Sequence, residues 1–135
     1  MMAHDITVKV RFSETDALGH VSNISYFIYL EEARVEFFRE LGLEITIDKW
    51  NVIMISANCL FYKQAYFDQR LKITSFVTKI GNSSFKIGHR ITDAATGELI
   101  AEGDAGAVYF DFTTQKSERL PDHIREKLEM HLKEV

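Results

Sequence analysis

The segment spanning residues 24–41 is the feature that most limits how this chain can fold. Its side chains at helical spacing are Phe27, Leu30, Arg34, Phe37 and Leu41, with Tyr26, Ala33 and Phe38 beside them. Apolar surface this wide predicts a long helix that other elements surround. Gly42 is placed to end the helix in a left-handed conformation, and Ser22 or Asn23 is placed to cap its start.

The rest of the chain favours strands. Residues 6–12 alternate, with Ile6, Val8, Val10 and Phe12 on one face. Four further strands are predicted over residues 52–66, 70–79, 84–92 and 99–112, separated in part by turns at 81–83 and 93–97. Gly103 and Gly106 in the last strand indicate a bulge or a close backbone approach. Pro121 is predicted to open a short C-terminal helix.

This order of elements predicts an α+β fold. About five antiparallel strands form one sheet, with the long helix on one face and a short helix at the end of the chain. The 135 residues suffice for a single domain with a real core, and we find no repeat or linker that would divide residues 1–135.

Charge and apolar content exclude several classes of protein. The formal charge is −4, with no cluster of Lys and Arg, so a nucleic-acid partner is not expected. Apolar runs are too short for a membrane helix, and the start of the chain lacks the pattern of a secretory leader. Cys59 is the only cysteine and has apolar neighbours, which favours a structural thiol. We therefore expect a cytoplasmic protein without a membrane partner.

The histidines give no sign of a metal site. They are dispersed, and no Cys or His pairs have the spacing of metal ligands. We interpret His89, His123 and His131 as solvated or satisfied surface residues. Neither a metal nor an organic cofactor is expected.

The loop before the long helix is the best place for chemistry. Asp16 lies seven residues ahead of Asn23, with Gly19 and His20 between them. A helix start offers unpaired N–H groups that can stabilise an oxyanion, and a carboxylate beside it can act as nucleophile or base. The alternative is that Asp16 only complements the helix dipole.

The loop resembles the signature of a known family. Residues 10–34 include the run Asp16-Ala17-Leu18-Gly19-His20-Val21-Ser22-Asn23, which looks like the Asp-x-x-Gly-His-Val-Asn-Asn of 4-hydroxybenzoyl-CoA thioesterase-like enzymes of the hotdog fold. Ala101-Glu102-Gly103 resembles a second recurring piece, so the likeness covers nearly the whole domain. It implies a hotdog fold and hydrolysis of an acyl-CoA to a carboxylic acid and CoA.

The resemblance also implies roles for individual residues. Asp16 matches the catalytic aspartate, which attacks the thioester carbonyl or activates water. His20 and Asn23 match supporting positions beside it, although Asn23 is equally placed to cap the helix. Gly19 matches a small loop residue, and Tyr26 a position that lines the acyl pocket or the core. Ser22 departs from the commoner Asn.

Other parts of the substrate site are implied further along the chain. An oxyanion donor falls around Asn51 and Val52, and a turn that contacts CoA corresponds to Asn82, Ser83 and Ser84, which otherwise form a plain hairpin turn. Family members dimerise with active sites between subunits, so a homodimer or homotetramer is expected.

Two alternatives to a thioesterase remain open. One is a hotdog dehydratase or hydratase, which would need a histidine with a partnered acid that His20 does not obviously supply. The other is a non-catalytic protein that binds acyl-CoA or a lipid-like ligand.

Overall fold

A computed structural model describes residues 3–133. Its elements, in chain order, are β1 (His4–Lys9), the 3-10 turn η1 (Phe12–Glu14), α1 (Asn23–Glu40), the 3-10 turn η2 (Ile47–Lys49), β2 (Val52–Phe61), β3 (Arg70–Ile80), β4 (Ser84–Asp93), β5 (Leu99–Asp111), β6 (Lys116–Ser117) and α2 (Asp122–Met130). In the part of the chain described, no helix is long and apolar enough to cross a membrane.

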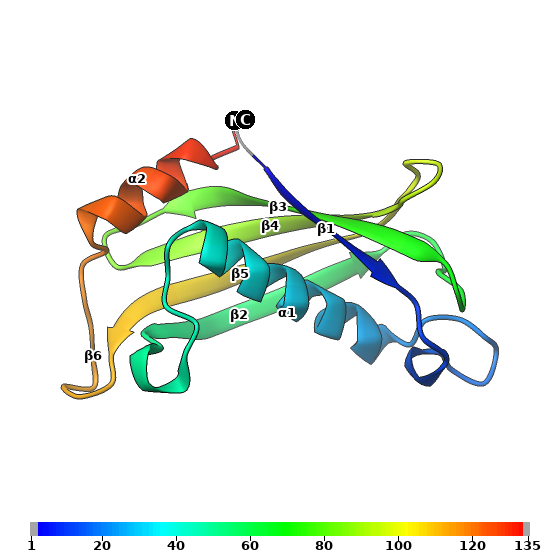
Figure 1. The fold of residues 1–135 in the computed structure, drawn as a ribbon, viewed down its shortest axis with the longest axis horizontal. Helices are drawn as coiled ribbons and strands as arrows, with labels where there is room; N and C mark the ends of the chain where they lie inside the picture. Colours follow the sequence, from blue (N-terminus) through cyan, green and yellow to red (C-terminus); the bar gives the residue numbers. More distant parts are fainter. Residues whose placement is uncertain (1–2, 134–135) are drawn as a thin grey trace.

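The strands form one antiparallel sheet that curls along α1 (Figure 1). The strand order is β1-β3-β4-β5-β2, and the short β6 pairs with β5. Consecutive strands β3, β4 and β5 are joined by tight turns, whereas β1 and β2 lie at opposite edges. The α+β class and the sheet of about five long strands are therefore confirmed.

Helix α1 begins and ends close to the predicted residues. Gly42 has a φ of 85° and follows the last turn, where the N–H of Gly42 donates to Arg39 O and that of Leu43 donates to Phe38 O. This pair of bonds is the Schellman motif, which requires a left-handed residue. Ser22 is the N-cap, but its side chain makes no capping bond, and Asn23 is the first helical residue. Neither predicted side-chain cap is present.

The core lies between α1 and the sheet in two clusters. One gathers around Tyr26, Leu30 and Ala33 near the start of α1, and the other around Phe37 and Phe38 near its end. The side of α1 that carries Ile24 and Phe27 is not covered, because Ile24 is 74% exposed and Phe27 is 38% exposed. The prediction that α1 is surrounded is thus wrong for this face within one chain.

Small residues in β5 let α1 approach the sheet. A Cβ on Gly103 would lie 2.6 Å from Leu30 Cδ1, so any side chain at this position would force Leu30 to shift. Gly106 lies opposite a bulge in β2 at Met54 and Ser56, and its N–H donates to Ser56 Oγ at 3.0 Å. The two glycines therefore serve a close approach and a bulge respectively, as their type predicts.

Several local predictions are wrong. The first strand ends at Lys9, so Phe12 lies in η1 and is 76% exposed. Strand β2 ends at Phe61, five residues before the predicted end at residue 66, because the chain turns after Phe61. Pro121 is the N-cap of α2 rather than its first helical residue.

Two histidines predicted at the surface are buried. His131 packs edge-on against Phe37, with ring centroids 5.2 Å apart. His89 is paired across the ladder with Ser75, whose hydroxyl is 2.8 Å from His89 Nδ1. A single polar partner on the next strand makes burial tolerable, and no pattern in the local sequence reveals that partner.

Candidate active site

The loop between η1 and α1 is a small closed hairpin. Thr15 bridges Val21, and the N–H of Asp16 donates to His20 O at 2.7 Å. The chain reverses through Gly19, whose φ of 81° suits glycine and whose N–H donates to Asp16 O. This loop, which carries Asp16, lies at the N-terminal end of α1 (Figure 1).

One oxygen of the Asp16 carboxylate is held by the loop itself. Oδ1 accepts from the N–H of Leu18 at 2.8 Å and from that of His20 at 3.2 Å. Oδ2 has no hydrogen-bond partner among residues 3–133, and the residue is exposed. This geometry fixes the direction of the carboxylate and leaves one oxygen available.

His20 belongs to the same hairpin and is anchored to the chain after β2. Its backbone bridges Tyr66, and the two rings meet edge-on with centroids 5.2 Å apart. The N–H of Val21 donates to Ala65 O at 2.8 Å. These contacts hold the arm of the loop that follows Asp16.

Asn23 and Tyr26 line a shallow hollow at the start of α1. The hollow holds about 150 Å³ and is completed by Phe61, Tyr62, Lys63 and Gln64. Tyr26 is buried, contacts the Phe61 ring edge-on at 5.1 Å, and accepts a hydrogen bond from Ala65 N–H. Burial raises the pKa of its phenol, which therefore stays neutral.

Asn51 and Val52 lie at the other end of the molecule. Asn51 Nδ2 donates to Tyr109 Oη at 2.8 Å, and Val52 opens β2 opposite Tyr109. Val52 is the first and Phe61 the last of the ten residues of β2, so the length of the strand separates Asn51 and Val52 from the hollow. Within one chain, the structure does not bring them to Asp16.

The turn of Asn82, Ser83 and Ser84 also lies at this far end, where α1 ends and α2 begins (Figure 1). Its carbonyl groups are already used, because Ser83 O accepts from Tyr109 N–H and Asn82 O from Leu120 N–H. Arg125 of α2 clamps the turn through Nη2, which donates to Gly81 O at 2.8 Å and Asn82 O at 3.1 Å. No local pattern indicates Arg125, because it lies 43 residues from Asn82 in the chain.

Glu14 is another residue that no local sequence pattern singles out. Its carboxylate is buried under the loop, bonded to Arg11 and to Tyr29 of α1. The spacing of Arg11 and Glu14 would have suggested the ion pair, but the bond to Tyr29 spans 15 residues and depends on the tertiary fold.

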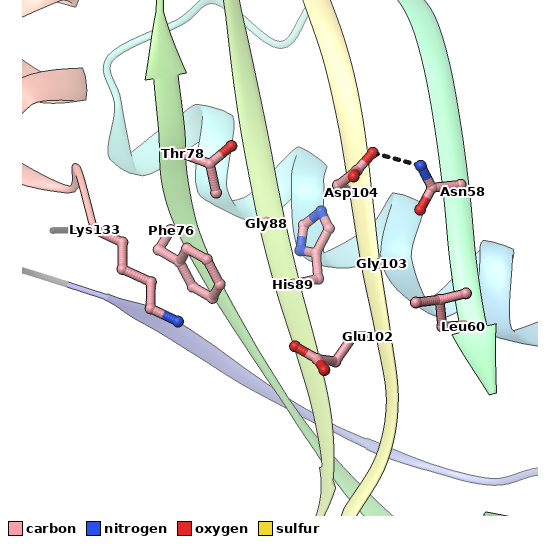
Figure 2. Close-up of a pocket in the computed structure, with 10 residues that line it drawn as sticks. All are labelled: Asn58, Leu60, Phe76, Thr78, Gly88, His89, Glu102, Gly103, Asp104 and Lys133. Atoms are coloured by element: carbon pink, nitrogen blue, oxygen red, sulfur yellow. Dashed lines mark hydrogen bonds between the residues drawn. The ribbon is translucent and has the colours of Figure 1, made fainter. Parts of the chain in front are cut away.

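A separate cavity of about 420 Å³ lies over β3, β4, β5 and β2 (Figure 2). Asn58 donates to Asp104 at 2.8 Å on one side, and Lys133 lies over the Phe76 ring on the other. Its lining contains none of the predicted site residues. No group of three potential metal ligands occurs within residues 3–133.

Comparison with known proteins identifies the family. The family description "thioesterase-like superfamily" matches residues 10–128. The chain belongs to this superfamily. It is 30% identical over 133 residues to the long-chain acyl-CoA thioesterase FadM of Escherichia coli, which covers 93% of this chain and 97% of FadM.

Solved thioesterase structures share the fold. A predicted thioesterase from Bacillus stearothermophilus superposes with a TM-score of 0.91 at 28% identity, covering 99% of both chains. A Thermus thermophilus thioesterase solved with coenzyme A and zinc gives a TM-score of 0.80 at 24% identity, covering 92% of this chain and 95% of its own. The hotdog architecture expected from the sequence is thereby confirmed.

Proposed function

We propose that this thioesterase-superfamily protein hydrolyses an acyl-CoA thioester to a carboxylic acid and CoA, with Asp16 as the essential group. The observation that carries the proposal is the Asp16 carboxylate, held through Oδ1 by two backbone N–H groups with Oδ2 free. The family membership and the similarity to FadM, a named acyl-CoA thioesterase, support the reaction class.

Two routes use the free oxygen. As a nucleophile, Asp16 Oδ2 attacks the thioester carbonyl, the C–S bond breaks, CoA leaves as a thiolate, and water hydrolyses the resulting anhydride. As a general base, Oδ2 takes a proton from water, which attacks the carbonyl, and the proton passes to the departing sulfur. After one turnover in H₂¹⁸O, label in Asp16 favours the first route, and label only in the released acid favours the second.

The start of α1 is one candidate for the oxyanion site. Among the described residues, the N–H groups of Asn23 and Ile24 have no acceptor, and Ser22 does not cap them with its side chain. Unpaired N–H groups at a helix start favour developing negative charge. His20 and Asn23 are proposed to orient the carboxylate or the acyl carbonyl, while Gly19 and Tyr26 shape the acyl end of the site.

A homodimer would unite the two ends of the site. Strand β2 is an edge strand with exposed apolar residues, since Ile55 is 63% and Leu60 60% exposed. Such an edge is a template for pairing. Antiparallel pairing with the β2 strand of a second copy places the first residues of one β2 beside the last residues of the other. Asn51 and Val52 would then approach the Asp16 loop of the partner.

The same arrangement gives a role to the turn at Asn82, Ser83 and Ser84. It lies at the same end of the chain as Asn51, so pairing would bring it toward the partner's site, where its hydroxyl groups could bind CoA phosphates. Light scattering at micromolar concentration tests the assembly, and a 15.6 kDa monomer would rule out a site shared between subunits.

The activity test measures free-thiol release from short, long and aromatic acyl-CoAs by the wild type and by Asp16→Asn. The variant keeps the size of the side chain but removes its nucleophilic and basic oxygen. We expect a loss of about 10²-fold or more in kcat/KM at unchanged oligomeric state. The cytoplasmic location stays a prediction, to be checked by cell fractionation.

A binding protein without turnover is the second candidate. The bonds from Leu18 and His20 to Asp16 Oδ1 would by themselves give Asp16 a structural role in its loop. In that case acyl-CoA raises the melting temperature by mass action, no thiol is released, and Asp16→Asn still binds.

A further inference from the structure

Glu14 is a buried carboxylate two residues before Asp16, with both oxygens bonded within the chain. Oε1 accepts from Arg11 N–H at 2.8 Å and from Tyr29 Oη–H at 2.9 Å. Oε2 accepts from Arg11 Nε at 3.1 Å and Nη2 at 2.8 Å. The Glu14 side chain is only 9% exposed, whereas that of Arg11 is 74% exposed. Of the four bonds, the one from Tyr29 is therefore the one sheltered from water.

The charge of Glu14 is stabilised in place. Burial opposes the charge, but the hydrogen bonds from Arg11 and Tyr29 outweigh it and lower the pKa of the carboxyl group. Burial, with the adjacent carboxylate, raises the pKa of Tyr29, which remains a hydrogen-bond donor. The pair therefore persists at neutral pH as a charge-assisted bond between the loop and α1.

The position of Glu14 connects α1 to the Asp16 hairpin. Glu14 O accepts from Ser22 N–H at 3.0 Å, which closes the base of the hairpin just outside the bridge between Thr15 and Val21. Tyr29 lies inside α1 and is buried, so its hydroxyl is a fixed point. The arm of the hairpin before Asp16 is therefore fastened to the helix through Glu14.

The bonds inside the hairpin cannot do this alone. Leu18, His20 and Gly19 bond to Asp16 itself, so they fix the shape of the hairpin but not its position relative to α1. The other arm is attached to Ala65 and Tyr66. Loss of the Glu14 carboxylate removes the side-chain attachment of the first arm to α1 and leaves only the backbone bond from Ser22 N–H to Glu14 O and the edge-on contact of Phe12 with Phe67. The hairpin can then shift relative to the body of the helix.

We propose that Glu14 is a positioning residue for the reaction, acting through Asp16 by fixing the hairpin to Tyr29. This inference rests on the proposed role of Asp16. A displacement of about 1 Å at a reacting group can cost 10²-fold in rate. Glu14 should therefore govern kcat while touching neither substrate nor the reacting atoms.

The test compares Glu14→Gln and Tyr29→Phe with the wild type, each also in an Asp16→Asn background. We expect kcat to fall about 10- to 100-fold in Glu14→Gln and less in Tyr29→Phe, with KM within about threefold. In the Asp16→Asn background neither change should reduce the residual rate further, because the residue through which they act is already inactive. A purely structural effect would lower both backgrounds equally and would overturn the proposal, as would an unchanged kcat.

Asp68→Asn is the matched control. It breaks the exposed ion pair of Asp68 with Lys9, 2.8 Å long, near the same end of β1 without touching Glu14. Asn tolerates the positive φ of 70° at this position. We expect its kcat to match that of the wild type. If Glu14→Gln does not fold, Tyr29→Phe carries the comparison, because it removes a single hydroxyl.

A readout without turnover separates this inference from the proposed function. NMR order parameters of the Leu18 and His20 amides should fall in Glu14→Gln, while those in the middle of α1 stay unchanged. If Asp16→Asn retains full activity, the proposed catalytic role of Asp16 is wrong. The order parameters then still test, without turnover, whether Glu14 positions the hairpin. Unchanged order parameters would overturn that role.

Discussion

The Ser75 hydroxyl and His89 Nδ1 lie 2.8 Å apart across strands β3 and β4, and both residues are buried. Their neighbours at alternate positions, Ile73 and Ile91, belong to the core, so the pair faces α1. His89 Nε2 is buried without a partner among the described residues. A proton on this ring would be stabilised by no carboxylate.

This pair predicts a loss of stability in mild acid. Burial, reinforced by the nearby charge of Arg34, lowers the pKa of His89 to about 3. In the unfolded chain the pKa is about 6.5, so below this pH the unfolded state binds a proton that the folded state does not. The contribution of neutral His89 to stability is complete above about pH 6.5 and is lost as the pH falls toward 3.

Urea unfolding of the wild type and His89→Gln from pH 7.5 to pH 4 measures this effect at constant protein concentration. The free energy of unfolding should change less steeply with pH in the variant than in the wild type. The difference in slope is up to about 1.4 kcal/mol per pH unit. His123→Gln, which removes an exposed histidine of α2, is the control and should retain the wild-type slope. Equal slopes for wild type and His89→Gln would contradict the buried neutral imidazole.

Gly103→Ala should destabilise the protein by about 1–3 kcal/mol, because the new methyl group overlaps Leu30 Cδ1 at 2.6 Å and approaches Asn58 O at 3.1 Å. Thermal or urea unfolding provides the measurement. In a Leu30→Ala background the same change should cost less, since most of the overlap is gone. Equal costs in the two backgrounds would show that Leu30 does not limit the space above Gly103.

Gly42→Ala tests the end of α1. With a φ of 85°, an L side chain is strained there, so a loss of about 1 kcal/mol is expected in the free energy of unfolding. Gly42→Asn should lose less, because Asn tolerates the left-handed region better. A gain in stability with Ala would mean that the helix ends in another conformation.

Cys59 should be a slow nucleophile. Burial raises the pKa of its thiol to about 11, so little thiolate exists at pH 8. Labelling by a disulfide reagent should be slow in the folded protein and fast in urea, and Cys59→Ser should retain most of the activity. Rapid labelling of the folded chain, or loss of turnover in Cys59→Ser at wild-type stability, would argue against a structural thiol.

Local patterns in the sequence were enough to predict the main elements. Helical spacing and Gly42 located α1 to within a residue at each end, and alternation with turn residues located β3, β4 and β5. The Asp16 hairpin was predicted as a site because its residues are close in sequence. Its role in catalysis stays a proposal, supported by the geometry of one carboxylate.

What the sequence determined by itself was therefore everything that depends on neighbours within a few residues: the helix, the strands, the α+β class and the loop that carries Asp16. The tertiary structure decided what depends on residues far apart in the chain. It buried His89 beside Ser75 and joined Glu14 to Tyr29. It also placed the start of β2, with Asn51, and the turn between β3 and β4 at the end of the sheet remote from the loop before α1 (Figure 1). The physical reason is that the spacing of apolar residues indicates which face of a helix or strand is buried. Which other element lies against that face depends on tertiary packing.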